Sequence, residues 1–387
     1  MQSTDLREHN LSVVLRSLVA SSEPASRAAI AKATRLTKPT VSKLVEELVG
    51  AGLVQEGSPQ VRGTGRPIVP LSPAQGTLVA LGLEVAADHI SCLAVDLAGR
   101  EVSQHTEYLH VTARSVDAAV DRSARLIAAA RTAAGAVPTV GICVALPGRI
   151  SPDGSRVLSA PNLGWTDVPF VERLAAHPLL DGLPVRAQND NRLAVNTELD
   201  RRPGASFLYV RGSTGVGGAI VLEGSVLDGQ HGWAGEIGHT VIEQGGARCR
   251  CGRRGCLEAY VSYHALRERA GLSEDVLIED LVDALALSTD RAEVIGTIGR
   301  SLGLAIANAL NVLDLSTVVL SGYLAPIAEE ISPVVRATVE AHALAVEAGP
   351  VTIERSDGLA DPSLRGAARA ALDPVLTSPG TWIRQHV

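Results

Sequence analysis

The sequence predicts an α/β protein of two successive units that carries a small helical head at its N-terminus. Three observations support this fold class. Residues 1–75 hold three short helix patterns followed by a basic β-hairpin pattern, an alternation of strands and helices begins again near residue 206, and the 387 residues include 37 glycines and 20 prolines. Only 3% of the residues are aromatic, so Ala, Val, Leu and Ile must form the core. An apolar fraction of 46% fits a folded chain of two or three domains.

Composition and charge limit where the protein works and what it meets. The sequence shows no apolar run long enough to cross a membrane and no secretory signal pattern at its start, which predicts a cytoplasmic protein. The net charge is −7, but residues 1–75 carry nine basic and six acidic side chains, so the rest of the chain carries −10. A basic head on an acidic body indicates that only the head meets a polyanion, although chance explains so small an excess equally well.

The head pattern consists of three helices and a hairpin. Residues 5–20 carry apolar side chains at helical spacing, and two further helix patterns begin after Ser26 and Thr37, which are good N-caps. The following segment, LVQEGSPQVRGTGRPIVPLS, predicts two short strands around a Gly/Pro/Arg loop, and Pro70 and Pro73 indicate a linker. Three helices and a basic hairpin are typical of a winged helix-turn-helix.

The third helix of such a motif enters the major groove of DNA. Four polar residues at its start or off its apolar stripe are free to contact bases and phosphates: Lys38, Thr40, Ser42 and Lys43. Arg62 and Arg66, which are flanked by glycines in the hairpin loop, suit a minor groove or phosphates. The alternatives are a structural helical bundle and a hairpin that contacts another protein.

Two α/β units follow the head. Residues 76–190 predict three successive strands, an Ala-rich helix over 115–134, and the buried strands TVGICVAL and VRAQND. Residues 191–361 predict a second unit that again opens with strands and then continues with helices. A closing helix over about 362–387 is expected to join the first unit. A cleft between two such units is a common place for a ligand.

The segment GHTVIEQGGARCRCGRRGC predicts a metal site. Its ligand candidates are His239, Cys249, Cys251 and Cys256, the set of a closed tetrahedral zinc site with one structural ion per chain. A disulfide would leave one of these cysteines over and would need an oxidising compartment, and free thiols do not explain three cysteines within eight positions. Cys92 and Cys143 lie in strand patterns and are predicted to be core residues.

Several polar residues are expected at the ends of these elements. Asn189 and Asp190 follow a strand at a β-to-α switch, Glu236 and His239 flank a turn, and Glu258 comes just after the last cysteine of the metal segment. Carboxylates and amides in such places suit a polyhydroxyl ligand, because each can bind two hydroxyl groups. Taken singly, each residue is more simply a surface charge or a helix cap, but the metal would draw Glu236 and Glu258 together.

The segments ASRAAIAKATRLTKPTVSKLVEEL, VALPGRI, QNDN, STGVGG, AGEIGH and CRCGRRGCLE make the chain resemble the ROK family of repressors, open reading frames and sugar kinases. The resemblance covers nearly the whole chain and is strongest to the repressor branch. It implies an actin-like (hexokinase/ribonuclease H-like) two-lobed ROK domain behind the winged helix-turn-helix, usually as a dimer or tetramer. It also implies a sugar site made of Asn189, Asp190, Glu236, His239 and Glu258, with added contacts from Gly148, Arg149 and Asn162. His239 would bind zinc with one ring nitrogen and face a sugar hydroxyl with the other.

The resemblance alone does not decide whether the chain is a kinase or a regulator, because the family contains both. In the family's kinases the aspartate that matches Asp190 is the general base, and an Asp-x-Gly-Gly-Thr turn admits phosphate. The matching turn here is Glu84-Val85-Ala86-Ala87-Asp88, which puts methyl groups and a carboxylate where phosphate would bind. We therefore expect no enzyme activity.

The expected function is a sugar-responsive DNA-binding transcriptional regulator that represses carbohydrate-utilisation genes. It would bind a palindromic operator as a homodimer or tetramer, with a monosaccharide or sugar derivative between the lobes as its effector. The alternatives are an ATP-dependent sugar kinase with a DNA-binding head, and a regulator that senses zinc or a protein partner.

Overall fold

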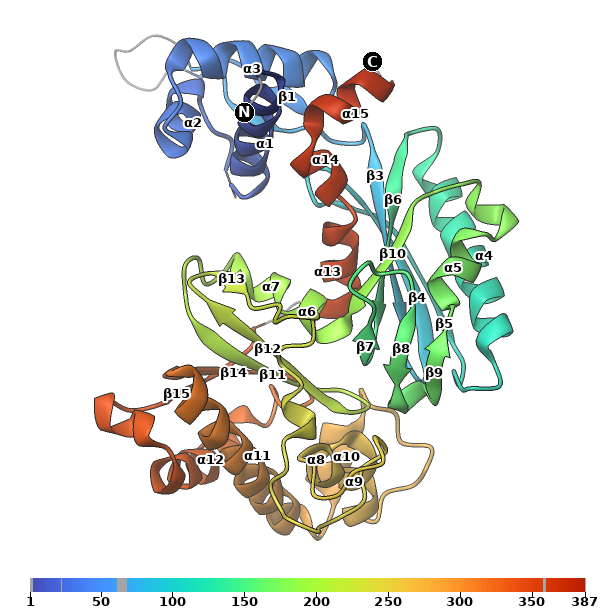
Figure 1. Ribbon diagram of the computed structural model, residues 1–387, viewed down its shortest axis with the longest axis vertical. Helices are drawn as coiled ribbons and strands as arrows, with labels where there is room; N and C mark the ends of the chain where they lie inside the picture. Colours follow the sequence, from blue (N-terminus) through green and yellow to red (C-terminus); the bar gives the residue numbers. More distant parts are fainter. Residues whose placement is uncertain (1–2, 22, 61–67, 358–359, 387) are drawn as a thin grey trace.

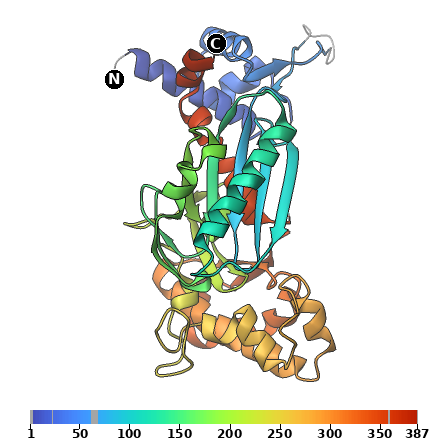
Figure 2. The same ribbon diagram turned by 90° about the vertical axis from the view of Figure 1, so that its right-hand side faces the viewer.

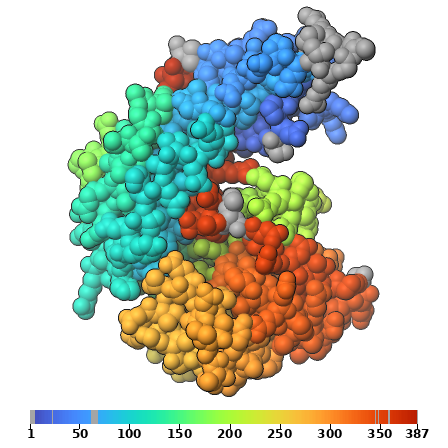
Figure 3. Space-filling model, turned by 180° about the vertical axis from the view of Figure 1, so that it is seen from behind, coloured from blue at the N-terminus to red at the C-terminus, as the bar shows by residue number. Residues whose placement is uncertain are grey.

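The computed structural model describes residues 3–21, 23–60, 68–357 and 360–386. A head, a first lobe and a second lobe follow one another along the long axis of the molecule (Figure 1). The space-filling view places the head and the second lobe at opposite ends, with the first lobe between them (Figure 3). Among the described residues, no helix is long and apolar enough to span a membrane.

The head consists of helices α1 (Ser3–Val19), α2 (Arg27–Thr34) and α3 (Lys38–Gly50) and the antiparallel strands β1 (Val54–Glu56) and β2 (Leu71–Pro73). The predicted caps are present, since Ser26 accepts a hydrogen bond from the backbone N–H of Ala29 and Thr37 accepts one from that of Thr40. The linker predicted at Pro70 and Pro73 is wrong at its second residue. Pro73 pairs with Val54 at the end of β2, a position where the missing N–H of proline is tolerated.

The first lobe is built on a sheet with strand order β10-β6-β3-β4-β5. Its strands are β3 (Val79–Val85), β4 (His89–Asp96), β5 (Glu101–Tyr108), β6 (Thr139–Leu146) and β10 (Val185–Asn189). The first three form an antiparallel meander, and β6 and β10 add in parallel. Helices α4 (Val116–Ala134) and α5 (Phe170–Ala175) cover one face, and α13 (Pro362–Ala370) covers the other (Figures 1 and 2).

A small antiparallel sheet extends the first lobe beside the cleft. Its strands are β7 (Arg149–Ile150), β8 (Val157–Ala160) and β9 (Trp165–Val168), and the short 3-10 helices η1 (Pro161–Leu163) and η2 (Pro178–Leu180) belong to the same part of the chain. The sequence patterns did not indicate this sheet, because strands of two to four residues are too short to show a period of two.

The second lobe repeats the strand pattern of the first. Its sheet has the order β13-β12-β11-β14-β15, with strands β11 (Phe207–Gly212), β12 (Val216–Leu222), β13 (Ser225–Val226), β14 (Thr317–Gly322) and β15 (Thr352–Arg355). The antiparallel meander β11–β13 is again extended by two parallel strands. This duplication agrees with the two successive α/β units that the sequence predicts.

Helices complete the second lobe and the junction between the lobes. The junction holds α6 (Asp190–Ala194) and α7 (Asn196–Leu199), and the lobe holds η3 (Ile237–His239), α8 (Glu258–Val261), α9 (Tyr263–Arg269), α10 (Leu281–Leu287), α11 (Arg291–Leu313), α12 (Ala328–His342) and η4 (Leu344–Ala348). The helices α11 and α12 pack closely at Gly303, where an added Cβ would lie only 2.5 Å from the Thr338 side chain.

The end of the chain returns to the head. The predicted closing helix begins at Pro362 but divides into α13, α14 (Asp373–Thr377) and α15 (Pro379–His386), because the backbones at Pro374 and Pro379 cannot continue a preceding helix. Ser12 of α1 donates a buried hydrogen bond to the carbonyl of Leu376, and apolar residues of the head, the first sheet and α13–α14 form one continuous core. The head is therefore packed onto the first lobe by the C-terminal helices.

Candidate functional site

A small cavity of about 50 Å³ lies between the two lobes. Seven of the eight residues predicted for the sugar line it: Gly148, Asn162, Asn189, Asp190, Glu236, His239 and Glu258. The eighth, Arg149, does not, and its guanidinium instead lies 5.0 Å from the centre of the Trp233 ring. The cavity gathers three carboxyl groups, three side-chain amides and an imidazole from both lobes.

The first-lobe side of the cavity is fixed by the end of β10. Asn189 caps α6, because its Oδ1 accepts hydrogen bonds from the backbone N–H groups of Asn191 and Arg192 at 2.9 and 3.1 Å. Its Nδ2 donates to the carbonyl of Gly148 at 3.0 Å. Gly148 has φ +90°, and a Cβ there would lie 2.2 Å from the carbonyl oxygen of Ser159, so only glycine fits this turn. These contacts turn Asp190 toward the cavity.

Glu258 is held on the second-lobe side by a glycine-rich loop. The Oε2 atom of Glu258 accepts a hydrogen bond from the backbone N–H of Val216 at 3.1 Å, and Glu258 is only 7% exposed. A Cβ at Gly215 would lie 2.1 Å from that same oxygen. The Ser213–Gly218 loop therefore has a local reason for its glycines, which is to let the Glu258 carboxylate reach the backbone.

The predicted metal ligands converge. One ligand atom from each of His239, Cys249, Cys251 and Cys256 lies within 4.8 Å of the others. The Sγ atoms of Cys251 and Cys256 are 3.8 Å apart, and Cys249 Sγ is 3.9 Å from Nδ1 of His239. A tetrahedral ion with sulfur at ~2.3 Å has sulfur ligands about 3.8 Å apart, so these residues fit a metal ion.

The other ring nitrogen of His239 faces the cavity. Its Nε2 lies 3.8 Å from Glu236 Oε2, and both residues line the cavity wall. Glu258 is tied to the same cluster, since its Oε1 is 3.6 Å from Cys249 Sγ. Gly255 completes the loop in a left-handed conformation (φ +76°), where a Cβ would lie 1.7 Å from the carbonyl oxygen of Glu243. The metal segment therefore positions two residues that line the cavity, His239 and Glu258.

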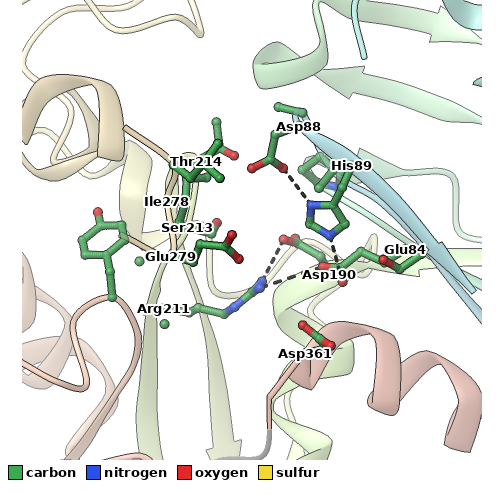
Figure 4. Close-up of a pocket in the computed structure, with 18 of the residues that line it drawn as sticks. Glu84, Asp88, His89, Asp190, Arg211, Ser213, Thr214, Ile278, Glu279 and Asp361 are labelled. Atoms are coloured by element: carbon green, nitrogen blue, oxygen red, sulfur yellow. Dashed lines mark hydrogen bonds and ion pairs between the residues drawn. The ribbon is translucent and has the colours of Figure 1, made fainter. Parts of the chain in front are cut away.

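A buried ionic network joins this cavity to a larger one (Figure 4). Arg211, at the end of β11, places a guanidinium nitrogen 3.2 Å from Asp190 Oδ2 and another 3.9 Å from Glu84 Oε1. His89 bridges the other side, with Nδ1 2.8 Å from Asp88 Oδ1 and Nε2 3.8 Å from Glu84 Oε2. Arg211 belongs to the second lobe and Glu84 to the first, so the network spans the cleft.

The network shifts the pKa values of its members. Burial raises the pKa of Asp190 to about 6, although the Arg211 cation opposes the rise, and the Glu84 and Glu236 carboxylates add to it. Burial disfavours the charged form of His89, but its contacts with Asp88 and Glu84 raise the pKa of that ring to about 10. Asp190 therefore titrates just below neutral pH beside a permanent cation.

The predicted DNA contacts are placed in part. Lys38 and Lys43 are exposed on α3, and Thr40 and Ser42 are half-buried on the same helix. The α3 residues Val41, Leu44, Val45 and Leu48 are buried instead, as the stripe pattern predicts. Arg62 and Arg66 lie outside the described residues.

Two residues of the site escaped the sequence analysis. Asn191 is 8% exposed, donates to Asp190 Oδ1 at 3.0 Å, and lies against Gly217, where a Cβ would be 2.2 Å from its Nδ2. The second residue, Arg211, is a charged residue inside the apolar strand FLYVRG. This position was a usable signal, because a buried arginine needs a carboxylate partner.

Comparison with known proteins agrees with this fold. The chain is 27% identical to the xylose repressor of Bacillus subtilis over 325 residues, which cover 82% of this chain and 83% of that one. It is 35% identical to a glucokinase of Halalkalibacterium halodurans over 231 residues, or 53% of this chain and 68% of that one. The crystal structure of a ROK family transcriptional regulator, a homologue of the E. coli MLC protein, superposes with a TM-score of 0.78 at 24% identity, covering 98% of this chain and 99% of that chain. The family model described as ROK family matches residues 80–373, and the chain therefore belongs to the ROK family.

Proposed function

We propose that the protein is a sugar-responsive DNA-binding transcriptional regulator that represses carbohydrate-utilisation genes. One observation carries the proposal: the helix that lines the small cavity is packed, through the C-terminal helices, onto the head. Asp190 begins α6, and a Cβ at Gly366 of α13 would lie 2.0 Å from the carbonyl oxygen of Leu193 in α6. Helix α14 follows α13 and accepts the hydrogen bond from Ser12. A short series of packed helices thus connects the cavity to the head.

The head is assigned as the DNA-binding part. Three helices and the β1–β2 hairpin fit a winged helix-turn-helix whose α3 enters the major groove. Lys38 and Lys43 are exposed where such a helix would meet DNA. We assign residues 1–75 to this domain, 76–190 with the helices from 362 onward to the first lobe, and 191–361 to the second lobe.

The small cavity is assigned as the sugar site, and the Cys/His cluster as its support. Zinc suits three thiolates and an imidazole, and four protein ligands leave no open position, so the ion would supply a structural cross-link. Held in this way, His239 keeps its Nε2 toward the cavity beside Glu236. Asp190 and Glu258 would accept hydrogen bonds from sugar hydroxyls on opposite sides.

A regulator fits the cleft better than an enzyme. Phosphoryl transfer requires the catalytic base to be free and the phosphate to be compensated by cations. Here Asp190 is paired with Arg211, and the turn that would face phosphate presents Asp88. A second candidate, an ATP-dependent sugar kinase with a DNA-binding head, is favoured by the presence of Asp190 and by the glucokinase relative. Sugar-dependent ATP turnover that disappears in Asp190→Asn would establish that candidate.

The mechanism we propose is linkage between sugar binding and head geometry. A homodimer or tetramer would present two heads to a palindromic operator, whose half-sites lie about one helical turn (~34 Å) apart or a multiple of that distance. Sugar bound between the lobes would favour one closure angle and change the spacing of the heads. A tenfold change in operator occupancy requires the sugar to distinguish the two states by about 1.4 kcal/mol.

The proposal is tested by fluorescence anisotropy with the DNA upstream of the protein's own gene, with and without a panel of sugars. We expect tight binding that one sugar abolishes. Glu258→Ala should keep operator affinity and weaken the sugar response about 10- to 150-fold, which corresponds to ~1.5–3 kcal/mol for a hydrogen bond to a charged group.

The matched control is Glu293→Ala, which removes an exposed carboxylate of α11 outside the cavity. It should respond to sugar like the unmodified protein. If Glu258→Ala still releases DNA at the original sugar concentration, the assigned sugar site is wrong. Release by a chelator, with no effect of any sugar, would point instead to a regulator that senses zinc.

A further inference from the structure

The small cavity opens into a much larger one. The larger cavity has about 620 Å³ and lies between the lobes around the Glu84–Arg211 network (Figure 4). Both cavities are lined by Pro147, Asn162, Asp190, Ser213 and Gly215. The small cavity alone holds only a few water molecules at ~10–15 Å³ each, far fewer atoms than a hexose ring carries. A sugar seated at Asp190 therefore extends into the larger cavity.

The charges of the larger cavity exclude a nucleotide. Six carboxyl groups line it, from Glu84, Asp88, Asp190, Glu279, Asp283 and Asp361. Only His89 and Arg211 supply cationic groups among its described lining residues, and both are already paired with carboxylates. Polyphosphate would meet net negative potential in a partly enclosed space, where charge repulsion is weakly screened. The volume therefore suits a ligand without acidic groups.

The larger cavity also has the surfaces that a sugar ring needs. Tyr108 lines it with its side chain 66% exposed, and Leu277 lines it from the other lobe, 44% exposed. Gln104, Thr106 and Tyr108 alternate along the edge strand β5, so they share one face of the sheet. An aromatic or aliphatic surface with neighbouring amide and hydroxyl groups suits a ring that has apolar faces and polar edges.

We propose that the effector is a non-acidic saccharide of at least two rings. The first ring lies between Asp190 and Glu258 and extends from the small cavity into the larger one, and the next ring lies wholly in the larger cavity against Tyr108 and Leu277. This inference rests on the proposed function, because it extends the same sugar site. It assigns the space between the lobes that faces Ala86, Ala87 and Asp88 to carbohydrate rather than to a nucleotide.

Isothermal titration calorimetry on the full chain tests the inference. The probes are glucose, xylose and N-acetylglucosamine, each beside its β-1,4-linked disaccharide, together with a non-hydrolysable ATP analogue. We expect one disaccharide to bind at least tenfold more tightly than its monosaccharide, and the ATP analogue not to bind. Tyr108→Ala and Leu277→Ala should weaken that disaccharide about five- to tenfold and leave the monosaccharide unchanged, whereas Tyr108→Phe should retain affinity.

The matched control is Leu179→Ala, because Leu179 is also 44% exposed but lines neither cavity. It should bind both sugars like the unmodified protein. Equal affinity for monosaccharide and disaccharide, or equal losses of both in Tyr108→Ala, would overturn the two-ring inference and leave the proposed function intact. Operator binding without binding of any saccharide would overturn the sugar response itself.

Discussion

Replacing Arg211 with methionine removes the only cation that contacts Asp190 among the described residues, while keeping a side chain of similar length. The Arg211 side chain is only 12% exposed, so Asp190 and Glu84 would face each other with little solvent between them. Removing one member of a buried ion pair costs ~3–5 kcal/mol of folding free energy. For a chain of 387 residues the shift is ~1.2 °C per kcal/mol, so the melting temperature should fall by roughly 4 °C or more at pH 8.

The loss should depend on pH in one direction. The pKa of Asp190 is already about 6, compared with an ordinary value of 3.8, so the folded state binds this proton more tightly than the unfolded state. The contribution of Asp190 to the free energy of unfolding therefore falls by ~3 kcal/mol as the pH rises from about 4 to 6, at ~1.36 kcal/mol per pH unit. Without Arg211 the pKa of Asp190 rises further, so at pH 5 the carboxyl is protonated and the repulsion from Glu84 and Glu236 is relieved.

The assay is thermal unfolding by circular dichroism at pH 5 and pH 8 in the same salt. Arg211→Met should lose more stability at pH 8 than at pH 5, and Arg211→Lys should lose little at either pH because it keeps the charge. Equal losses of Arg211→Met at both pH values, or a loss below 1 kcal/mol, would refute this account of the network.

Two further perturbations probe the small cavity. Gly215→Ala puts a methyl group 2.1 Å from Glu258 Oε2, so the carboxylate must leave the backbone N–H of Val216. Sugar affinity should then fall about tenfold, with little change in melting temperature. Gly50→Ala, where nothing lies within 4 Å, is the matched control in the same calorimetric titration. Cys251→Ser removes one of the four predicted metal ligands, so the metal content, measured by mass spectrometry, should fall. The sugar affinity should fall as well, because the metal-binding segment then no longer fixes the position of Glu258. Unchanged sugar affinity in a metal-free sample would contradict that coupling.

The features predictable from sequence were those set by neighbouring residues. The caps at Ser26 and Thr37 follow from residues three positions away, and the metal ligands lie within one short segment. The family's motifs then gave the eight residues predicted for the sugar, seven of which line one cavity. Arg149 does not line that cavity, and its guanidinium lies over the ring of Trp233, a residue far along the chain.

The rest depends on contacts that no local pattern reports. Arg211 meets Glu84 only when the two sheets face each other across the cleft. Helix α12 was not indicated, since Pro333 in its interior interrupts the helical pattern. The hydrogen bond from Ser12 to Leu376 joins residues 364 positions apart, and its existence depends on the position of the whole first lobe.

The packing of α1 against α14 and α15 has a consequence for biosynthesis. The head is translated before the two lobes, but Ser12 and Glu8 of α1 find their partners at Leu376 and Gly380 only after about 300 further residues have been made. At ~5–20 residues per second, the nascent head waits roughly 15–60 s with one side of its core uncovered. A ribosome that stalls within the lobes therefore leaves α1 without its contacts to α14 and α15, which form only once the chain has been translated through these helices.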